Sequence, residues 1–215
     1  MKNLRVLMYR RQVELIGEKN QELLSTKSVL IVGCGGLGNI IATTISCIGL
    51  KKIYLVDFDN IETHNIHRQF QFSLKDIGKN KAKKLCEKIK RCDTEVNAFE
   101  SYFNEDMDIK VDLVFDATDN FDVRKKIDKF AKKQNIPWIY ASVEEWHGQI
   151  GVFKTASFEI FATKNHDVKG QLSPMVNLIG SISSMLGIKC LTGDCKEILY
   201  YVNFKEDLDV KKFRL

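Results

Sequence analysis

Hydrophobic and polar residues along the first two thirds of the chain predict strands separated by helices. Short apolar runs typical of buried strands occupy residues 28–32, 51–59, 95–100, 111–120 and 138–143. Helical spacing follows the first run as far as about residue 48, and it returns at 80–91 and 123–134. This alternation predicts a parallel sheet covered by helices on both faces.

The pattern changes after residue 145. Residues 148–153 and 158–163 look like two strands close enough to pair antiparallel, and 172–191 looks like a buried helix. Two closing strands are expected at 197–204 and 209–215. The fold class is therefore α/β: a Rossmann-like, mostly parallel sheet with helices on both faces, extended by antiparallel strands in the C-terminal third.

No linker rich in Pro, Gly or Ser and no internal repeat divides the chain. Its 215 residues suit one domain with a sizeable core. We therefore expect a single domain over residues 1–215. It comprises an N-terminal helix at 9–25, a core of strands and helices at 27–145, and a strand-rich and helical part at 146–215.

The composition is that of a globular protein, with 44% apolar residues. Residues 1–14 lack the continuous apolar stretch of a signal peptide, and 172–191 is too polar to span a bilayer. We therefore expect a cytoplasmic protein without a membrane partner. The net charge of +5 comes mostly from two helical segments in which no aromatic residues alternate with the cations. Solvated helix faces explain this charge better than nucleic acid does.

Six cysteines are scattered along the chain without a C-x-x-C pair. A structural zinc site usually needs two such close pairs, so no zinc is expected. We expect free and mostly buried thiols in a reducing compartment. The cysteines are Cys34, Cys47, Cys86, Cys92, Cys190 and Cys195.

A glycine-rich turn, GCGGLG, directly follows the first strand. It contains Gly33, Gly35, Gly36 and Gly38, and G-x-G-x-x-G between a strand and a helix is typical of nucleotide-binding turns. Free amides at the helix N-terminus then face the phosphate oxygens. Asp57 ends the next strand, where a carboxylate accepts hydrogen bonds from ribose hydroxyls. Residues 27–145 thus form a nucleotide-binding core, which suits a redox dinucleotide and ATP alike.

The loop beyond this strand favours ATP. A pyrophosphate is bound largely by the glycine turn, whereas fixed cations are more useful for a triphosphate whose α-phosphorus is attacked. Arg68 can bind phosphate oxygens in bidentate fashion, and Lys81 can act as a point charge. Either residue alone would suit an ordinary basic surface. The polar residues of this region are Asp59, Asn65, Arg68, Gln69 and Lys81.

The segment DATDN ends a later strand with Asp116, Asp119 and Asn120. Carboxylates at the C-terminal edge of a parallel sheet point into the ligand crevice. Asp119 is therefore a candidate Mg²⁺ ligand. A helix N-cap is the structural alternative for Asp119 or Asn120.

Seven short motifs together resemble the ThiF/MoeB/HesA family. They are YRRQ, GCGGLG, DFD, NIHRQF, IGKNKA, ATDN and HGQI, and the resemblance covers residues 9–193. Members of this family are bacterial relatives of the ubiquitin-activating enzymes. They adenylate the C-terminal glycine carboxylate of a small ubiquitin-like carrier protein. The resemblance implies an adenylyltransferase that uses ATP and Mg²⁺.

The resemblance also implies roles for single residues. Asp119 matches the Mg²⁺-binding aspartate, and Arg11 matches an arginine that reaches the partner subunit's active site, which implies a homodimer with composite sites. Because the attacking carboxylate is already ionised, no general base is needed. Arg11, Arg68, Lys81 and the metal would instead neutralise the repulsion between two anions. The other matches are Asp57 for the ribose, Asp59 beside the phosphates, Asn65, Arg68 and Gln69 of the N-x-x-R-Q motif, and Lys81 with Arg68 on the triphosphate.

Two departures from the family pattern concern zinc and sulfur. Most family members carry two zinc-binding C-x-x-C pairs, and both are missing here. Some relatives also carry a cysteine in the crossover loop, whereas residues 163–174 contain none. Sulfur transfer by this loop is therefore not expected, and His166 within it is interpreted as an exposed, non-catalytic residue. Cys34 occupies a variable position of the glycine turn and is given no catalytic role.

Four functions remain open from the sequence. We favour activation of the sulfur carrier of the thiamine thiazole pathway, because the chain is short and lacks the zinc pairs; activation of the molybdopterin-synthase carrier is the close alternative. A nicotinamide-dependent oxidoreductase would explain the glycine turn and Asp57, but not Arg68, Lys81 and Asp119. A non-catalytic, partner-binding relative would typically have lost the catalytic arginine or aspartate.

Overall fold

The protein contains an eight-stranded sheet in a computed structural model that describes residues 2–160 and 170–215. The strand order is β3-β2-β1-β4-β5-β6-β7-β8, parallel from β3 to β5 and antiparallel from β5 to β8. The expected α/β fold, with its parallel core and antiparallel extension, is confirmed. The strands are β1 Ser28–Val32, β2 Lys52–Val56, β3 Glu95–Phe99, β4 Leu113–Asp116, β5 Trp138–Glu144, β6 His147–Phe153, β7 Ile198–Asn203 and β8 Asp209–Arg214.

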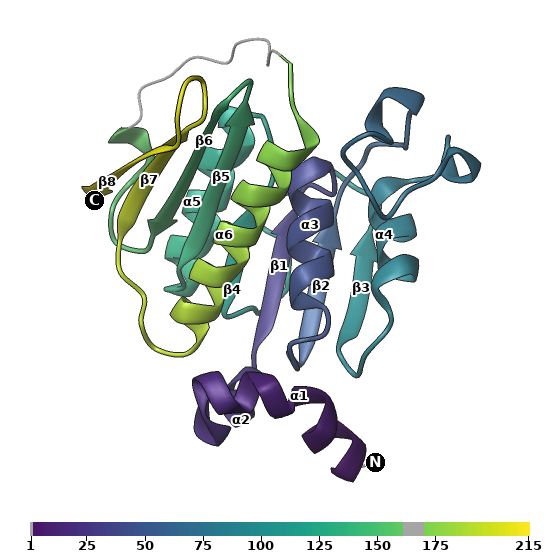
Figure 1. Ribbon diagram of the computed structural model, residues 1–215, viewed down its shortest axis with the longest axis vertical. Coiled ribbons are helices and arrows are strands. Elements are labelled where there is room, and N and C mark those ends of the chain that lie inside the picture. The colour runs from purple at the N-terminus through teal and green to yellow at the C-terminus, as the bar shows by residue number, and fades with distance from the viewer. Residues whose placement is uncertain (1, 161–169) are drawn as a thin grey trace.

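Helices cover both faces of the sheet (Figure 1). Helices α3, α4 and α6 pack on one face and α5 on the other, while α1 and α2 lie beyond the end where the parallel strands begin. The sheet is therefore the middle layer of a three-layer core. The helices are α1 Lys2–Ile16, α2 Glu18–Leu24, α3 Gly36–Ile45, α4 Lys81–Ile89, α5 Phe121–Gln134 and α6 Ser173–Leu191, and the 3-10 turns are η1 Thr63–Asn65, η2 Leu74–Asp76 and η3 Phe158–Ile160.

Helix α6 packs across the antiparallel and parallel parts of the sheet. Glycines allow close contact there, because a Cβ on Gly180 would lie 2.9 Å from Ile40 and one on Gly187 only 2.3 Å from Phe115. Among the described residues, α6 is the one helix long and apolar enough to cross a membrane by length and composition. Its contacts with α3, β5 and β6 are those of a core helix, as its sequence predicts.

Two expected elements are wrong in detail. The N-terminal segment 9–25 is not one helix: it divides at Gly17, whose φ of 81° interrupts helical geometry between α1 and α2. Residues 158–160 form the 3-10 turn η3 rather than the start of a strand, and 161–163 lie outside the described residues. The antiparallel partners of β6 are β5 and β7, so that turn takes no edge of the sheet.

The expectation of free thiols is wrong for four of the six cysteines. Cys47 is bonded to Cys92, and Cys190 to Cys195, while Cys34 and Cys86 are free and buried. Cys47 follows α3 and Cys92 follows α4, two neighbouring helices that end on the same side of the sheet. The pairing thus follows from the packing of the helices, which the spacing of cysteines in the sequence does not reveal.

Candidate active site

A cleft of about 840 Å³ opens at the carboxyl ends of β1, β2 and β4 and continues over the antiparallel strands. Parallel strands β1, β2 and β4 are neighbours, so the loops that follow them meet at this edge. The structure brings most of the predicted site residues to this cleft, although their chemical roles stay predictions. Those that line it are Gly33, Gly35, Gly36, Asp57, Asp59, Asn65, Arg68, Gln69, Lys81, Asp119 and Asn120.

The glycine turn forms the floor of the cleft. Gly33 has a φ of 90°, and a Cβ there would lie 2.7 Å from the Ala117 carbonyl oxygen. A Cβ on Gly38 would lie only 1.9 Å from the Gly33 carbonyl oxygen. Gly38 does not line the cleft; it lets α3 pack closely on the turn. Gly35 and Gly36 line the cleft, and a Cβ on Gly36 would lie 2.9 Å from the Val176 side chain.

Asp57 holds the turn and the next loop together. Its Oδ2 accepts a hydrogen bond from the Cys34 amide at 2.6 Å, and its Oδ1 accepts one from the Asp59 amide at 2.8 Å. Burial raises the pKa of Asp57, and these two amides oppose the rise. Each carboxylate oxygen has a second lone pair, which leaves Asp57 able to accept a hydrogen bond from a ribose hydroxyl.

Cys34 is part of the glycine turn, and its side chain is buried. Burial, followed by the charge of Asp57, raises the pKa of its thiol well above the ordinary value. A protonated, inaccessible thiol is a poor nucleophile. These surroundings agree with the absence of a catalytic role for Cys34.

Lys81 reaches the cleft from the first turn of α4. Its Nζ lies 2.9 Å from Asp59 Oδ2, and its amide donates to the Asp59 carbonyl oxygen at 2.9 Å. The Lys81 side chain is only 10% exposed, whereas that of Asp59 is 48% exposed. Lys81 is therefore a fixed cation at the wall of the cleft, with a partner that can turn toward solvent when an anion binds.

The loop after β2 carries the N-x-x-R-Q motif. Asn65 points inward, where its Oδ1 accepts the Glu62 amide at 2.9 Å. Arg68 donates from Nη1 to the His64 carbonyl oxygen at 2.9 Å. Burial lowers the pKa of Arg68, and the negative charge of Asp119 across the cleft opposes this shift. Arg68 and Asp119, which lie 51 positions apart in the sequence, thus act on each other electrostatically.

Gln69 is buried beside the glycine turn. A Cβ on Gly35 would lie 3.7 Å from Gln69 Nε2. Gln69 Oε1 is buried without a hydrogen-bond donor from the part of the chain that the structure describes. The side-chain amide is therefore held at the position where phosphate oxygens would approach the turn.

The loop after β4 separates two aspartates that the sequence places together. Asp116 is fully buried and does not line the cleft: its Oδ1 accepts hydrogen bonds from the Thr118 amide and hydroxyl, and its Oδ2 accepts one from Arg124. The expectation that Asp116 points into the crevice is therefore wrong. Asp119 is exposed at the cleft, and Asn120 caps α5 by accepting the amides of residues 122 and 123.

Sequence patterns missed Arg124 and an aromatic pair. Arg124, one turn into α5, lies at the cleft with only 3% of its surface exposed. Its position four residues beyond the last residue of DATDN is the one signal that would have drawn attention to it. Phe58 and Tyr102 stack at the lip of the cleft with ring centroids 3.9 Å apart, and both are exposed. Tyr102 lies in a loop without a motif, so nothing in the sequence links it to Phe58.

Polar side chains of the HGQI strand line the far part of the cleft. His147 Nδ1 lies 2.9 Å from the Tyr201 hydroxyl, and Gln149 Oε1 accepts a hydrogen bond from the Tyr140 hydroxyl at 3.0 Å. These residues belong to β5, β6 and β7, so the cleft extends from the glycine turn over the antiparallel strands.

Arg11 lies far from this cleft in its own chain. Tyr9 is buried against Gly49, and Gln12 donates to the Ile48 carbonyl oxygen at 2.8 Å, so the YRRQ motif attaches α1 beneath the sheet. The Arg11 side chain is 91% exposed and pairs with Glu14. Helix α1 lies at the end of the sheet where the parallel strands begin (Figure 1), whereas the residues that line the cleft follow the carboxyl ends of these strands. His166 lies outside the described residues.

The donor set around Asp119 suits a metal shared with phosphate. Within residues 2–160 and 170–215, no group of three or more His, Cys, Asp or Glu side chains could hold a metal ion. Magnesium usually takes one or two carboxylates and completes its shell with phosphates and water. The exposed Asp119 fits that chemistry, and the expectation that zinc is absent stays a prediction.

Comparisons with known sequences agree on one family. The sequence profile of the ThiF family matches residues 9–214. The chain is 32% identical over 202 residues to an adenylyltransferase and sulfurtransferase MOCS3 of Dictyostelium discoideum, covering 86% of this chain and 47% of the relative. It is 30% identical over 210 residues to the molybdopterin-synthase adenylyltransferase of Escherichia coli, covering 87% and 83%. The chain therefore spans about half the length of the first relative and most of the second.

Solved structures share the fold. The E. coli MccB structure with MccA-N7isoASN superposes with a TM-score of 0.85 at 20% identity, covering 96% of this chain and 72% of that one. The PaaA structure gives a TM-score of 0.82 at 21% identity, covering 97% and 73%. At these identities the likeness concerns the fold alone.

Proposed function

Because this chain belongs to the ThiF family, we propose that it is an ATP-dependent adenylyltransferase that activates the C-terminal glycine carboxylate of a ubiquitin-like sulfur-carrier protein. The observation that carries the proposal is the meeting of Arg68, Lys81 and Asp119 in one cleft above a phosphate-binding glycine turn. A nicotinamide cofactor would use the turn and Asp57 but would leave these three side chains without a common purpose.

The nucleotide fits the cleft with its triphosphate over the glycine turn. Amides at the N-terminus of α3 and the Gln69 side chain face the phosphate oxygens, and Asp57 accepts a ribose hydroxyl. The stacked rings of Phe58 and Tyr102 offer an apolar face for the adenine at the open lip. Mg²⁺ held by Asp119 would neutralise part of the triphosphate charge.

In the reaction, a carboxylate oxygen of the carrier's terminal glycine attacks the α-phosphorus of ATP. The bond between that phosphorus and the bridging oxygen breaks, and pyrophosphate leaves with the electron pair, which gives an acyl-adenylate. No proton needs to be removed, because the attacking carboxylate is ionised at neutral pH. Arg68 and Lys81 hold the two anions together and stabilise the charge that builds on the phosphate oxygens.

The part of the cleft over β5, β6 and β7 supports a peptide tail as the second substrate. Its length beyond the nucleotide site leaves space for an extended C-terminus, and His147, Gln149 and Tyr201 supply polar contacts along it. The relatives' names favour the molybdopterin-synthase carrier over the thiazole carrier that the short, zinc-less sequence favoured. We therefore propose the molybdopterin-synthase carrier as the first candidate substrate.

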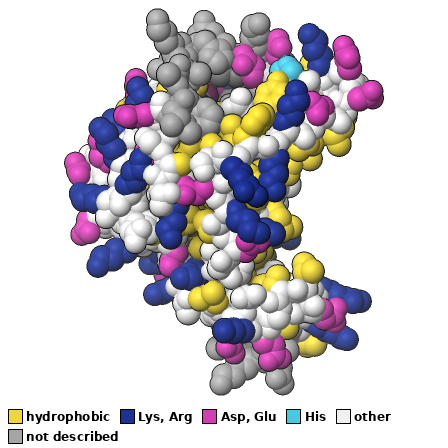
Figure 2. Space-filling model, turned by 90° about the vertical axis from the view of Figure 1, so that its left-hand side faces the viewer, with side chains coloured by type: hydrophobic (Ala, Val, Ile, Leu, Met, Phe, Trp, Pro, Cys, Tyr) yellow, Lys and Arg dark blue, Asp and Glu magenta, His cyan; other side chains and the backbone are white. Residues whose placement is uncertain are grey.

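A homodimer with composite sites completes the proposal. Arg11 is exposed on α1, and α1 lies at the end of the sheet where the parallel strands begin, so in this proposal Arg11 acts in the cleft of another copy of the chain. The N-terminal helices project from the body of the molecule (Figure 2). Leu7 and Leu15 of α1 are exposed hydrophobic side chains. Both features support a partner subunit packed against α1. The need for ATP supports a cytoplasmic location.

Exchange of labelled pyrophosphate into ATP tests the choice of carrier. Purified protein is assayed with a molybdopterin-synthase carrier, a thiazole-pathway carrier, and a version of each that lacks the terminal glycine. We expect exchange with the intact molybdopterin-synthase carrier. Exchange with the thiazole carrier alone would reassign the pathway, while binding of NAD(H) without ATP binding would favour an oxidoreductase.

A further inference from the structure

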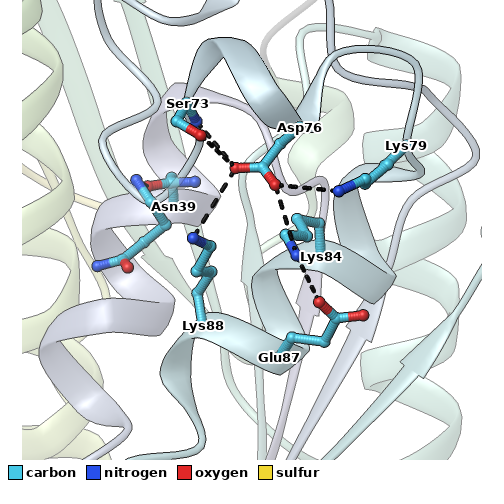
Figure 3. Close-up of polar contacts among 8 residues, drawn as sticks. Asn39, Ser73, Asp76, Lys79, Lys84, Glu87 and Lys88 are labelled. Carbon is cyan, nitrogen blue, oxygen red and sulfur yellow. Dashed lines mark hydrogen bonds and ion pairs between the residues drawn. The ribbon is translucent and has the colours of Figure 1, made fainter.

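Asp76 is a buried carboxylate outside the cleft that the proposed reaction does not use. Its side chain is only 5% exposed and lies at the end of η2, between α3 and α4 (Figure 3). Its Oδ2 accepts hydrogen bonds from the Ser73 amide at 3.0 Å and the Ser73 hydroxyl at 2.8 Å. Because this carboxylate is buried and hydrogen-bonded, it differs from an exposed surface ion pair, which usually contributes little to stability.

Three lysines surround the same carboxylate. The Nζ atoms of Lys84 and Lys79 lie 3.4 and 3.5 Å from Asp76 Oδ1, and that of Lys88 lies 3.8 Å from Oδ2. Burial by itself would raise the pKa of Asp76, but the Ser73 hydrogen bonds and the lysines hold it well below the ordinary range. Because Lys84 and Lys88 belong to α4, Asp76 attaches the loop that precedes this helix to the helix itself.

The loop attached in this way, residues 57–80, carries most of the phosphate side of the cleft. A second attachment holds its middle to α3: Asn39 Oδ1 accepts the Gln71 amide at 3.0 Å, and Gln71 donates to Thr43 at 3.1 Å. Arg68 and Gln69 lie just before this attachment. A Cβ on Gly36 would lie 3.6 Å from Arg68 Cδ, so a small shift of the loop would separate Arg68 from the glycine turn.

We infer that Asp76 is a positioning residue that fixes the loop 57–80 between α3 and α4, so that Arg68 faces the glycine turn opposite Lys81. Arg68 touches the nucleotide under the proposed function, on which this inference rests, and Asp76 acts through it. Long loops are ordinarily mobile, and this one is held at residues 71 and 76 instead.

The test measures ATP binding by calorimetry, which needs no carrier. The proteins are wild type, Asp76→Asn, Arg68→Ala and the double variant, at a temperature where each is fully folded by circular dichroism. Asp128→Asn is the matched control, because Asp128 is also a buried carboxylate paired with a lysine but lies on α5 beside Trp138. We expect Asp76→Asn to raise the Kd for ATP on the order of tenfold and the control to leave it unchanged.

The double variant separates positioning from simple stability. If Asp76 acts through Arg68, the double variant will have the Kd of Arg68→Ala alone. Additive effects of the two substitutions on the Kd for ATP would overturn the inference. So would a normal Kd for Asp76→Asn together with a lowered melting temperature, or a normal Kd for Arg68→Ala. Should Asp76→Asn not fold, Ser73→Ala removes one hydrogen bond without changing charge, and a normal Kd for that variant would also count against it.

This binding test is distinguishable from the test of the proposed function. If ATP binds, and the coupled effects of Asp76→Asn and Arg68→Ala appear, the positioning role stands even when no carrier supports exchange. In that case the proposed function alone fails. If exchange occurs but Asp76→Asn binds ATP normally, the enzyme is an adenylyltransferase whose loop is positioned without Asp76.

Discussion

Arg124 Nε lies 3.0 Å from Asp116 Oδ2, with both side chains buried beneath the loop that carries Asp119. Arg124 also donates to the Thr118 carbonyl oxygen, next to Asp119 in sequence. Burial raises the pKa of Asp116, and the charge of Arg124 opposes that rise and favours the ionised form. The pair therefore sets the backbone from which the candidate metal ligand extends.

Replacing Arg124 by alanine should leave Asp116 buried without its cation. Breaking one side of a buried pair commonly costs about 3–5 kcal/mol of unfolding free energy. Urea denaturation of Arg124→Ala measures this loss. Arg124→Lys keeps the charge but cannot donate to Asp116 and Thr118 in the same forked geometry, so we expect an intermediate loss. Wild-type stability of both variants would contradict a structural role for the pair.

Two glycines of the turn should respond differently to alanine. In Gly38→Ala the new Cβ would meet the Gly33 carbonyl oxygen at 1.9 Å, so the protein should unfold more easily or fail to fold. In Gly35→Ala the nearest atom is 3.7 Å away, so the fold should persist, but the methyl group would occupy space where phosphate approaches. Melting temperature and ATP affinity, measured side by side, check this contrast. Normal ATP binding by folded Gly35→Ala would place the phosphates elsewhere.

Asp76 should make the free energy of unfolding depend on pH in the acidic range. Its pKa is lowered in the folded state, so its contribution is present above the unfolded value of about 3.9 and is lost as the pH falls below it. The difference in unfolding free energy between wild type and Asp76→Asn should therefore be constant near pH 6–7 and narrow toward about pH 3. Asp57 and Asp116, whose pKa values are raised, cancel in this difference. If the difference in unfolding free energy between wild type and Asp76→Asn did not change with pH, the lowered pKa of Asp76 in the folded state would be contradicted.

Arg11 offers a test of the composite dimer. Arg11→Ala and Arg68→Ala should each lose pyrophosphate exchange while remaining folded, because one removes the partner's cation and the other removes the cation of the cleft itself. Mixing the two inactive variants under conditions that exchange subunits should restore activity, since a mixed dimer contains one intact site. Retained activity of Arg11→Ala, or no recovery on mixing, would contradict a site shared between subunits.

Elements of the fold with a strong local signal were predictable from the sequence. The first strand was predicted at residues 28–32 and is observed as β1 Ser28–Val32, because a short apolar run before a glycine turn has few alternatives. The division at Gly17 was missed, since a single glycine is compatible with a continuous helical pattern. Segment 158–163 resembled a strand by composition, but β7 occupies the available edge of β6.

The site residues that directly follow strands were predictable from the sequence. Those that reach the cleft through the packing of helices and loops were not. Asp57 and Asp119 come after β2 and β4, so sheet topology brings them together. Arg124 and Tyr102 reach the cleft through the packing of a helix and a loop, which no short motif records. Asp76 had a local signal, because Ser73 three residues before it forms a capping box, but two of its lysine partners, Lys84 and Lys88, belong to α4.

Transfer of an adenylyl group to the C-terminus of a carrier protein can be seen in the mass of the carrier. Intact-mass spectrometry measures this mass after incubation of the carrier with the protein, ATP and Mg²⁺. We expect the carrier to gain the mass of one adenylyl group. That gain should be absent with Asp119→Ala and with a carrier that lacks its terminal glycine. An unmodified mass for every Gly-Gly carrier tested, with ATP bound and the protein folded, would contradict adenylyl transfer.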